Sequence, residues 1–159
     1  MVILPAETRH IPGILKLLEQ VGQVHHQIRP DIFGSGAIKY SPSELEQLLK
    51  DPDRPIFIAE SDGVAGYCFC IHRHIANSEL LVGREELYID DLCVDENHRR
   101  MGIAKALYRH VCDYAKALGC HSITLNVWCG NAGAERFYAD MGMTMRNITM
   151  EYRLEDGKC

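Results

Sequence analysis

The stretch LYIDDLCVDENHRRMGIA, residues 87–104, decides the fold of this chain. Residues 86–94 are mostly apolar and β-prone, which predicts a strand. The polar turn DENHRRMG follows, and then comes the strongest helical pattern of the sequence. One face of this helix carries Ile103, Leu107, Val111, Tyr114 and Leu118, and Gly119 ends it. A strand that passes directly into an amphipathic helix predicts a strand–helix–strand unit.

The residues that follow complete this unit. Ile123–Val127 is a second β-prone run, so the two strands and the helix between them form a right-handed unit with parallel strands. Asn131 is a good N-cap for a further helix, which Gly142 closes. We expect a last strand over Met143–Leu154.

The N-terminal half contributes antiparallel strands and two more helices. A β-prone start at Val2–Leu4 precedes a helical pattern from Ile11 to Val21, and Gly22 ends that pattern. Residues 24–40 carry few periodic cues. Ser41 starts a short helix, with Pro42 at its first position and Glu44 completing a capping box. Two strands, Ile56–Glu60 and Val64–Ile75, flank Asp62-Gly63, a hairpin signal.

These elements predict an α+β fold: a mixed, mostly antiparallel sheet of about six or seven strands with a central parallel pair, and helices on both faces. The chain has 159 residues, 47% apolar and 25% charged, without repeats or long linkers. We therefore expect a single domain over residues 1–159.

Charge and cysteine content narrow the function classes. The net charge of −5 argues against a surface that binds nucleic acid or anionic lipid, and suits a small cationic substrate. No apolar run approaches the length of a membrane span, and the N-terminus lacks a signal-peptide pattern. The seven cysteines are scattered along the sequence, which indicates reduced thiols. We therefore expect a cytoplasmic protein.

The turn before the long helix has the features of an anion site. The first N–H groups of a helix lack internal partners and lie at the positive end of its dipole. Gly102 lets a ligand approach the backbone, and Arg99 and Arg100 add positive charge. These features predict a diphosphate site. The turn is neither a Walker P-loop nor a dinucleotide-binding fingerprint, because the glycines and the lysine of those motifs are absent.

The pattern Arg99-x-x-Gly102-x-Ala104 resembles the acyl-CoA signature of the GCN5-related N-acetyltransferases. Three more features agree in order and spacing: LYIDDLCV resembles the family's fourth strand, Asn131 with Phe137-Tyr138 and Gly142 resembles a later segment, and the N-terminal half has the expected helix and hairpin. The resemblance covers nearly the whole chain and is specific between Leu87 and Gly142.

The resemblance implies that acetyl-CoA binds in a gap between the strands at 87–94 and 123–127, without a metal. Backbone groups of Leu92, Cys93 and Val94 would hold the pantetheine arm, and one N–H would polarise the thioester carbonyl. Asn131 would bond the pantetheine arm while capping its helix. The residues implied to surround the pyrophosphate are Arg99, Arg100, Met101, Gly102, Ile103, Ala104 and Lys105.

The resemblance also implies the groups that move protons during direct attack of an amine on the thioester. Tyr138 matches the family's general acid near the CoA sulfur. Asp90 matches the base position of polyamine-type acetyltransferases, with Asp91 beside it and a water relay as a further option. Neighbouring strand residues face opposite sides of a sheet, so only one aspartate is expected to face the acceptor unless a bulge intervenes.

We expect the acceptor to be a small primary amine, polyamine-like or amino-acid-like, with a protein N-terminus or lysine as the alternative. Two alternative functions belong to other classes: a non-catalytic acyl-CoA-binding module and a nucleotide-binding protein. Homodimers are common in the family, so a homodimer is possible here, but nothing in the sequence identifies an interface.

Three other groups of residues have side chains that could bind a metal, react or contact a substrate. Cys68, Cys70, His72 and His74 alternate along one strand, too extended for all four to bind one zinc ion, although His72 and His74 could supply two ligands. Cys129 lies close to the expected chemistry and could carry an acetyl group. His25 and His26 lie in the segment that would cover the acceptor site.

Overall fold

The computed structural model describes residues 1–154. Its contacts divide the chain into two compact units, Met1–Trp128 and the residues from Cys129 onward. None of the helices within residues 1–154 is both long enough and apolar enough to cross a membrane.

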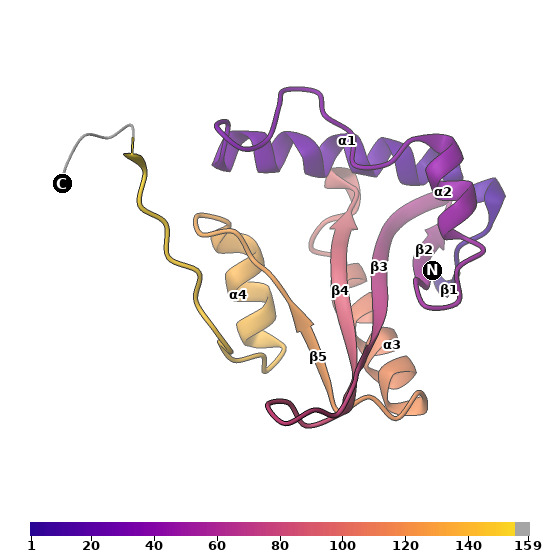
Figure 1. Ribbon diagram of the computed structural model, residues 1–159. Coiled ribbons are helices and arrows are strands. Elements are labelled where there is room, and N and C mark those ends of the chain that lie inside the picture. Colours follow the sequence, from indigo (N-terminus) through magenta and orange to yellow (C-terminus); the bar gives the residue numbers. More distant parts are fainter. Residues whose placement is uncertain (155–159) are drawn as a thin grey trace. The chain divides into compact units, whose positions relative to one another are not determined.

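The first unit is built on one five-stranded sheet with the order β1-β2-β3-β4-β5 (Figure 1). The strands are β1 (Val2–Pro5), β2 (Ile56–Ser61), β3 (Gly63–Ile75), β4 (Arg84–Val94) and β5 (Ser122–Leu125). Neighbouring strands from β1 to β4 are antiparallel, and β5 is parallel to β4. The mixed sheet with a parallel pair confirms the expected fold class. The described residues form five strands rather than six or seven, and the parallel pair lies at one edge of the sheet rather than at its centre.

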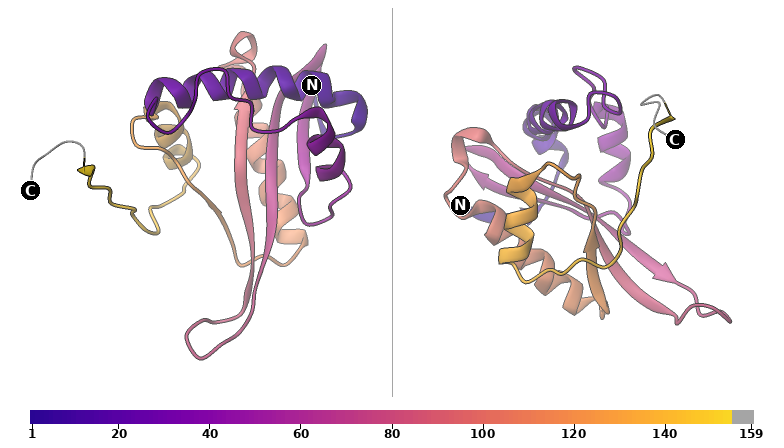
Figure 2. Two further views of the ribbon diagram at one scale, coloured as in Figure 1. Left: turned by 45° about the horizontal axis from the view of Figure 1, so that its top comes forward. Right: turned by 90° about the vertical axis from the view of Figure 1, so that its left-hand side faces the viewer.

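Helices cover both faces of this sheet (Figure 2). They are α1 (Ile11–Ile28), α2 (Pro42–Leu48) and α3 (Ile103–Ala117), with short 3₁₀ turns η1 (Thr8–His10) and η2 (Glu96–His98). On one face, Tyr67 and Phe69 of β3 belong to the buried cluster that contains α1. On the other face, Gly66 lies against Ile103 and Leu107 of α3, so close that a Cβ atom would come within 3.2 Å of both side chains.

Helix α1 runs past the glycine that was expected to end it. It continues through Gly22 to Ile28. A Cβ atom at Gly22 would lie 2.6 Å from the carbonyl oxygen of Ala37, so the glycine is needed for the close approach of the following loop. The sequence prediction mistook a packing glycine for a helix stop.

The second unit contains helix α4 (Ala132–Asp140). The side chain of Asn131 accepts a hydrogen bond from the N–H of Ala134 at 3.2 Å, which confirms the expected N-cap. The strand expected over residues 143–154 is wrong, because the structure has no strand after α4 in the part of the chain that it describes. Met145, Ile148 and Met150 stay exposed there, and a strand needs both a pairing partner and a face to bury.

Candidate active site

A β-bulge in β4 is the central feature of the site. Tyr67 of β3 pairs with Cys93 and Phe69 pairs with Asp91, but the next residue of β3, Cys70, pairs with Ile89. Asp90 is therefore an extra residue without a partner on β3. The alternation of side chains along β4 changes at this point.

The bulge brings both aspartates to the face covered by α1. The hydroxyl of Tyr67 donates to Asp91 Oδ2 at 2.8 Å. Asp90 Oδ2 accepts from the hydroxyl of Tyr40 at 3.0 Å and from Lys39 Nζ at 2.8 Å. The ring of Tyr40 stacks on Phe69, on this same face, with centroids 5.5 Å apart. The bulge thus meets the condition under which both carboxylates could face the acceptor.

The electrostatics distinguish the two carboxylates. Burial raises the pKa of Asp91, and the negative charge of Asp90 adds to this, while the hydrogen bond from Tyr67 opposes it. Asp90 is ion-paired with Lys39, and its side chain is 18% exposed. The raised pKa makes Asp91 a candidate base, whereas Asp90 is held in an ion pair with Lys39.

The two tyrosines stay protonated around these carboxylates. Burial raises the pKa of Tyr40 to about 12, with Asp90 contributing. Burial and Asp91 raise the pKa of Tyr67 well above its usual value. Both hydroxyls therefore act as hydrogen-bond donors at neutral pH.

The bulge also marks the point where β5 separates from β4. The last parallel pair is Ile89 with Leu125, whereas β4 continues to Val94 (Figure 1). Within residues 1–154, β5 offers no ladder partner to residues 90–94, which include Leu92, Cys93 and Val94. A strand edge with free backbone groups is what an extended ligand needs to bind as an added strand.

The turn between β4 and α3 has the conformation of an anion site. Arg100 has φ 66° and Gly102 has φ 79°, so two residues of this short turn adopt a left-handed backbone conformation. Gly102 is the N-cap of α3, so no side chain caps the first N–H groups of that helix. A Cβ atom at Gly102 would meet nothing within 4 Å, so the space above this backbone is open. These observations fit a bound diphosphate, with Arg99 and Arg100 exposed beside it.

The start of this turn is held by Asp95, at the end of β4. Asp95 accepts a hydrogen bond from the N–H of Asn97 at 2.9 Å and forms an ion pair with Lys16 at 3.0 Å. The hydrogen bond from Asn97 and the cation of Lys16 lower the pKa of Asp95 to about 2. The buried, charged cap fixes where the chain leaves the sheet and enters the anion site.

An aromatic cluster lies where the segment after α1 meets the chain beyond β5. The ring of Phe33 packs edge-on against Trp128 at 5.2 Å, and His25 lies 5.0 Å from Phe33. The guanidinium of Arg29 lies 5.8 Å from the centroid of Trp128. His26 Nδ1 lies 2.6 Å from the carbonyl oxygen of Phe33, which anchors the segment to α1. These contacts connect α1 and the segment after it to Trp128, which follows β5 in the chain.

Sequence reasoning identified Asp90 and Asp91 but missed their partners. Lys39 and Tyr40 lie in a segment without periodic cues, and their partner Asp90 is 50 residues away from Tyr40. Tyr67 could have been found, because its alternation with Phe69 puts it on the face covered by α1. The bulge itself has no signal in the sequence of β4 alone, since it depends on the register with β3.

Comparisons with known proteins agree with this geometry. The model of the acetyltransferase (GNAT) family matches residues 22–143. The chain belongs to this family. It is also 31% identical over 111 residues to an uncharacterized N-acetyltransferase of Methanocaldococcus jannaschii. That match covers 69% of this chain and 48% of the relative, so the chain spans about half of that relative's length.

Two solved structures share the GNAT fold with this chain. A tetramutant of the BH1408 protein of Bacillus halodurans has a TM-score of 0.92 and 28% identity, covering 96% of this chain and 99% of that one. The aminoglycoside N-acetyltransferase AAC(6')-Iy, in complex with CoA, has a TM-score of 0.70 and 19% identity, covering 99% and 100% of the two chains. The second likeness shows the fold alone.

The remaining residues of the family pattern lie in the second unit. Asn131 caps α4, and Tyr138 lies on α4 with its ring 5.0 Å from that of Phe137. Cys129 is an exposed free thiol.

Three further residues of the first unit have ordinary partners. Asn126, just beyond β5, donates to the hydroxyl of Tyr88 at 3.2 Å. Cys68 and Cys70 lie next to each other in the core, with sulfurs 3.8 Å apart. The contact with Cys70 and burial raise the pKa of Cys68 well above its usual value, so this thiol is not a nucleophile.

Proposed function

We propose that this chain is an acetyl-CoA-dependent N-acetyltransferase whose acceptor is a small primary amine. The observation that carries the proposal is the bulge at Asp90, where two carboxylates gather beside the free edge of β4. Family membership supports acetyl transfer, and the pair of carboxylates supports an amine as the acceptor. A single acetyltransferase domain in the cytoplasm is part of the proposal, since the six described cysteines are all free thiols.

The cofactor side of the site would use backbone more than side chains. The N–H groups of Met101 to Lys105 would bind the pyrophosphate, with Arg99 and Arg100 adding charge. The free edge at Leu92, Cys93 and Val94 would hold the pantetheine arm, and an N–H there would stabilise negative charge that develops on the carbonyl oxygen. Acetyl-CoA would supply the activated acetyl group. The related aminoglycoside enzyme, whose structure contains CoA, supports this choice of cofactor.

The acceptor side would select a cation. Asp90 and Asp91 place two carboxylates at the bulge, and Lys39 pairs with only one of them. An ammonium group is attracted to such a site, and the aromatic cluster of Phe33, Trp128 and His25 offers apolar surface to the rest of the acceptor. Polyamine-like and amino-acid-like amines have this combination.

Proton transfer would use Asp91 and Tyr138. The amine must lose a proton before its nitrogen attacks, and Asp91, whose pKa is raised by burial, would accept it directly or through one water molecule. Lys39 and Tyr40 donate hydrogen bonds to the Asp90 carboxylate and fix its position. From this position the negative charge of Asp90 would orient the ammonium group. Tyr138 would donate a proton to the departing thiolate, as the family pattern implies. The attack would occur in a ternary complex.

A thiol-release assay with acetyl-CoA tests this proposal. The panel contains polyamines, amino acids, aminoglycosides and short peptides with a free N-terminus or lysine. We expect CoA release that depends on a small amine and is fastest with a polyamine-like or amino-acid-like acceptor. Release with peptides alone would assign a protein acetyltransferase instead. CoA binding without release on any amine would assign a non-catalytic CoA-binding module and overturn the proposal.

A further inference from the structure

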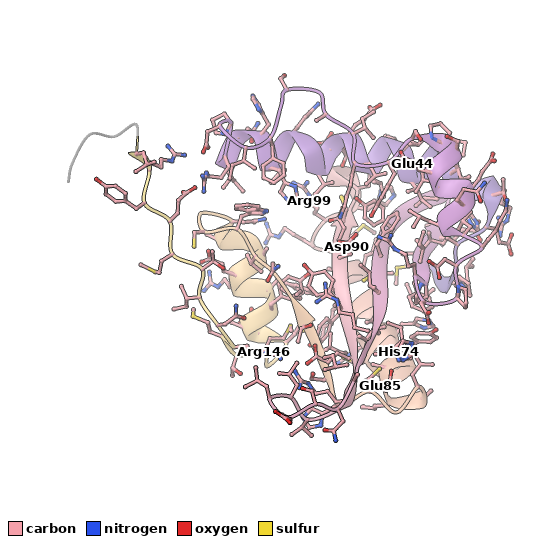
Figure 3. The ribbon with its side chains drawn as sticks, in the orientation of Figure 1. Glu44, His74, Glu85, Asp90, Arg99 and Arg146 are labelled. Carbon is pink, nitrogen blue, oxygen red and sulfur yellow. The ribbon has the colours of Figure 1, made fainter. Side chains whose placement is uncertain are left out.

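Four ionisable side chains gather at the opposite end of β4 from the bulge. They are Asp53, just before β2, His72 and His74 on β3, and Glu85 on β4. Figure 3 shows His74 and Glu85 together near the lower end of the sheet, away from Asp90. The proposed acetyl transfer uses none of these four residues.

The sheet itself brings these residues together. His74 and Glu85 are directly paired across β3 and β4, so their side chains share one face. The N–H of His72 donates to the carbonyl oxygen of Asp53 at 2.7 Å, and the N–H of Cys70 donates to Pro55 at 2.9 Å. The segment before β2 therefore lies alongside β3 and holds Asp53 next to both histidines. Three backbone segments therefore meet at the cluster.

Each imidazole turns one nitrogen to Asp53 and the other to Glu85. Asp53 Oδ1 lies 3.4 Å from His74 Nε2 and 3.8 Å from His72 Nδ1. Glu85 Oε2 lies 2.6 Å from His74 Nδ1 and 2.8 Å from His72 Nε2. The two rings lie with centroids 4.3 Å apart. Such a pairing leaves one nitrogen of each ring available to an ion at the Asp53 side.

The internal contacts do not fully satisfy this cluster. His72 Nε2 and Glu85 Oε2 are both buried and lie 2.8 Å apart on the side away from Asp53, where their contact lacks good hydrogen-bond geometry. On the side away from Glu85, Nδ1 of His72, Nε2 of His74 and Oδ1 of Asp53 face one small volume.

We propose that Asp53, His72 and His74 bind a divalent transition-metal ion, with Zn²⁺ the best match, and that Glu85 holds the outer nitrogens of the two imidazoles. The ligand atoms of the three residues all lie within 4.8 Å of one another. Zinc bonds of about 2.1 Å in a tetrahedron place neighbouring ligand atoms roughly 3.4 Å apart, close to the two distances from Asp53. A carboxylate that bonds the second nitrogen of a metal-binding histidine is a common outer partner of zinc sites.

The ligand chemistry also limits which ion fits. Imidazole nitrogen favours Zn²⁺ and similar transition metals, whereas Mg²⁺ and Ca²⁺ favour sites made of oxygen atoms. With three protein ligands, the fourth position of a tetrahedral ion is left to water or another small ligand. The bound ion would link the segment before β2 to β3, so its main effect would be on stability.

Zinc binding to tag-free, chelator-treated protein tests this assignment. Equilibrium dialysis against Zn²⁺ with metal analysis measures the stoichiometry, and thermal unfolding measures the effect on stability. We expect one Zn²⁺ that is lost on Asp53→Asn, His72→Asn or His74→Asn, and a Tm rise of about 5 °C or more at saturating zinc. Mg²⁺ should cause no such rise. Glu85→Gln should weaken zinc binding about tenfold.

The control is His121→Asn, which changes an exposed histidine outside the cluster. It should bind zinc as the unchanged chain does. Circular dichroism confirms that each variant is folded, and Asp53→Asn is the mildest of the three because its carboxylate is 55% exposed. The assignment is overturned if the unchanged chain takes up no stoichiometric zinc. It is also overturned if Asp53→Asn keeps the bound zinc, which would place the ion elsewhere, for example on the cysteines.

Discussion

At the residue scale, Asp91 is the residue on which the proposed mechanism depends most. Burial raises the pKa of this carboxyl above its ordinary value of 3.8, so the folded chain binds the proton more tightly than the unfolded chain does. As the pH rises from 3.8 through the raised pKa, ionisation lowers the free energy of unfolding, and the loss persists at neutral pH. The protein therefore accepts a cost in stability for a carboxylate that can act as a base.

We predict that Asp91→Asn stabilises the protein and inactivates it. The substitution removes the buried charge while keeping an oxygen that accepts from Tyr67, so unfolding at neutral pH should need about 1 kcal/mol more. Amine-dependent CoA release should fall by roughly 100-fold or more. Thermal unfolding at neutral pH and at about pH 3.5 measures the gain in stability. This gain should shrink at the lower pH, where Asp91 of the unchanged chain carries less charge. A variant that is both less stable and fully active would remove Asp91 from the mechanism.

We further predict that Tyr67→Phe moves the pH profile. The hydroxyl of Tyr67 donates to Asp91 at 2.8 Å and lowers the pKa of that carboxyl, so its loss should raise the pKa further. The rising limb of kcat/KM against pH should shift to higher pH, measured with one amine so that the ionisation of the acceptor is common to both profiles. Tyr88→Phe is the control, because Tyr88 contacts Asn126 rather than Asp91. An unshifted profile would mean that Asp91 does not titrate in the reaction.

At the element scale, the proposed function assigns binding of the CoA pyrophosphate to the turn before α3. We predict that Gly102→Ala weakens CoA binding, because alanine disfavours φ 79° and its methyl group would occupy the open space above the backbone. Isothermal titration calorimetry with CoA measures the effect, which should be at least about tenfold.

The matched control for this turn is Gly119→Ala at the other end of α3. Gly119 has φ 73°, and a Cβ atom there would also meet nothing within 4 Å. Both variants should lose about 1 kcal/mol of stability from backbone strain, but only Gly102→Ala should lose CoA affinity. Equal losses of affinity would mean that the effect comes from strain and not from the anion site.

The elements also show how far sequence reasoning reaches. The helix at Ile103–Ala117, the parallel pair and the N-caps at Ser41 and Asn131 follow from local patterns, because caps and amphipathic periodicity depend on nearby residues. The passage of α1 through Gly22 and the lack of a strand after α4 could not be predicted locally. Each depends on contacts with distant segments, such as the carbonyl of Ala37 above Gly22.

The same limit applies to the candidate site. The sequence predicted the two aspartates and the anion-binding turn, which are adjacent in the chain. The bulge, the partners of Asp90 and the cluster of Asp53 with His72, His74 and Glu85 depend on strand register, which a single sequence does not specify. The alternation of His72 and His74 along one strand indicated two possible zinc ligands. No pattern in the sequence places Asp53 beside them.

At the scale of the first unit, the sheet supports two chemically different regions. The bulge end of β4 carries carboxylates, aromatic rings and the anion-binding turn, and the end near Glu85 carries the histidine cluster (Figure 3). Because the two regions share strands but no residues, we expect Asp53→Asn to leave the rate of acetyl transfer in zinc-free buffer within about twofold of the unchanged chain. Thiol release measured in a chelator-containing buffer checks this independence, and a large loss of rate would show that the two regions are coupled.

The most direct test of the central claim is mass analysis of the amine after incubation with acetyl-CoA. The fastest acceptor of the panel is incubated with the unchanged chain and with Asp91→Asn under the same conditions. The account predicts an amine heavier by one acetyl group with the unchanged chain and little of this product with the variant. Free CoA without acetylated amine, or equal product from both proteins, would contradict it.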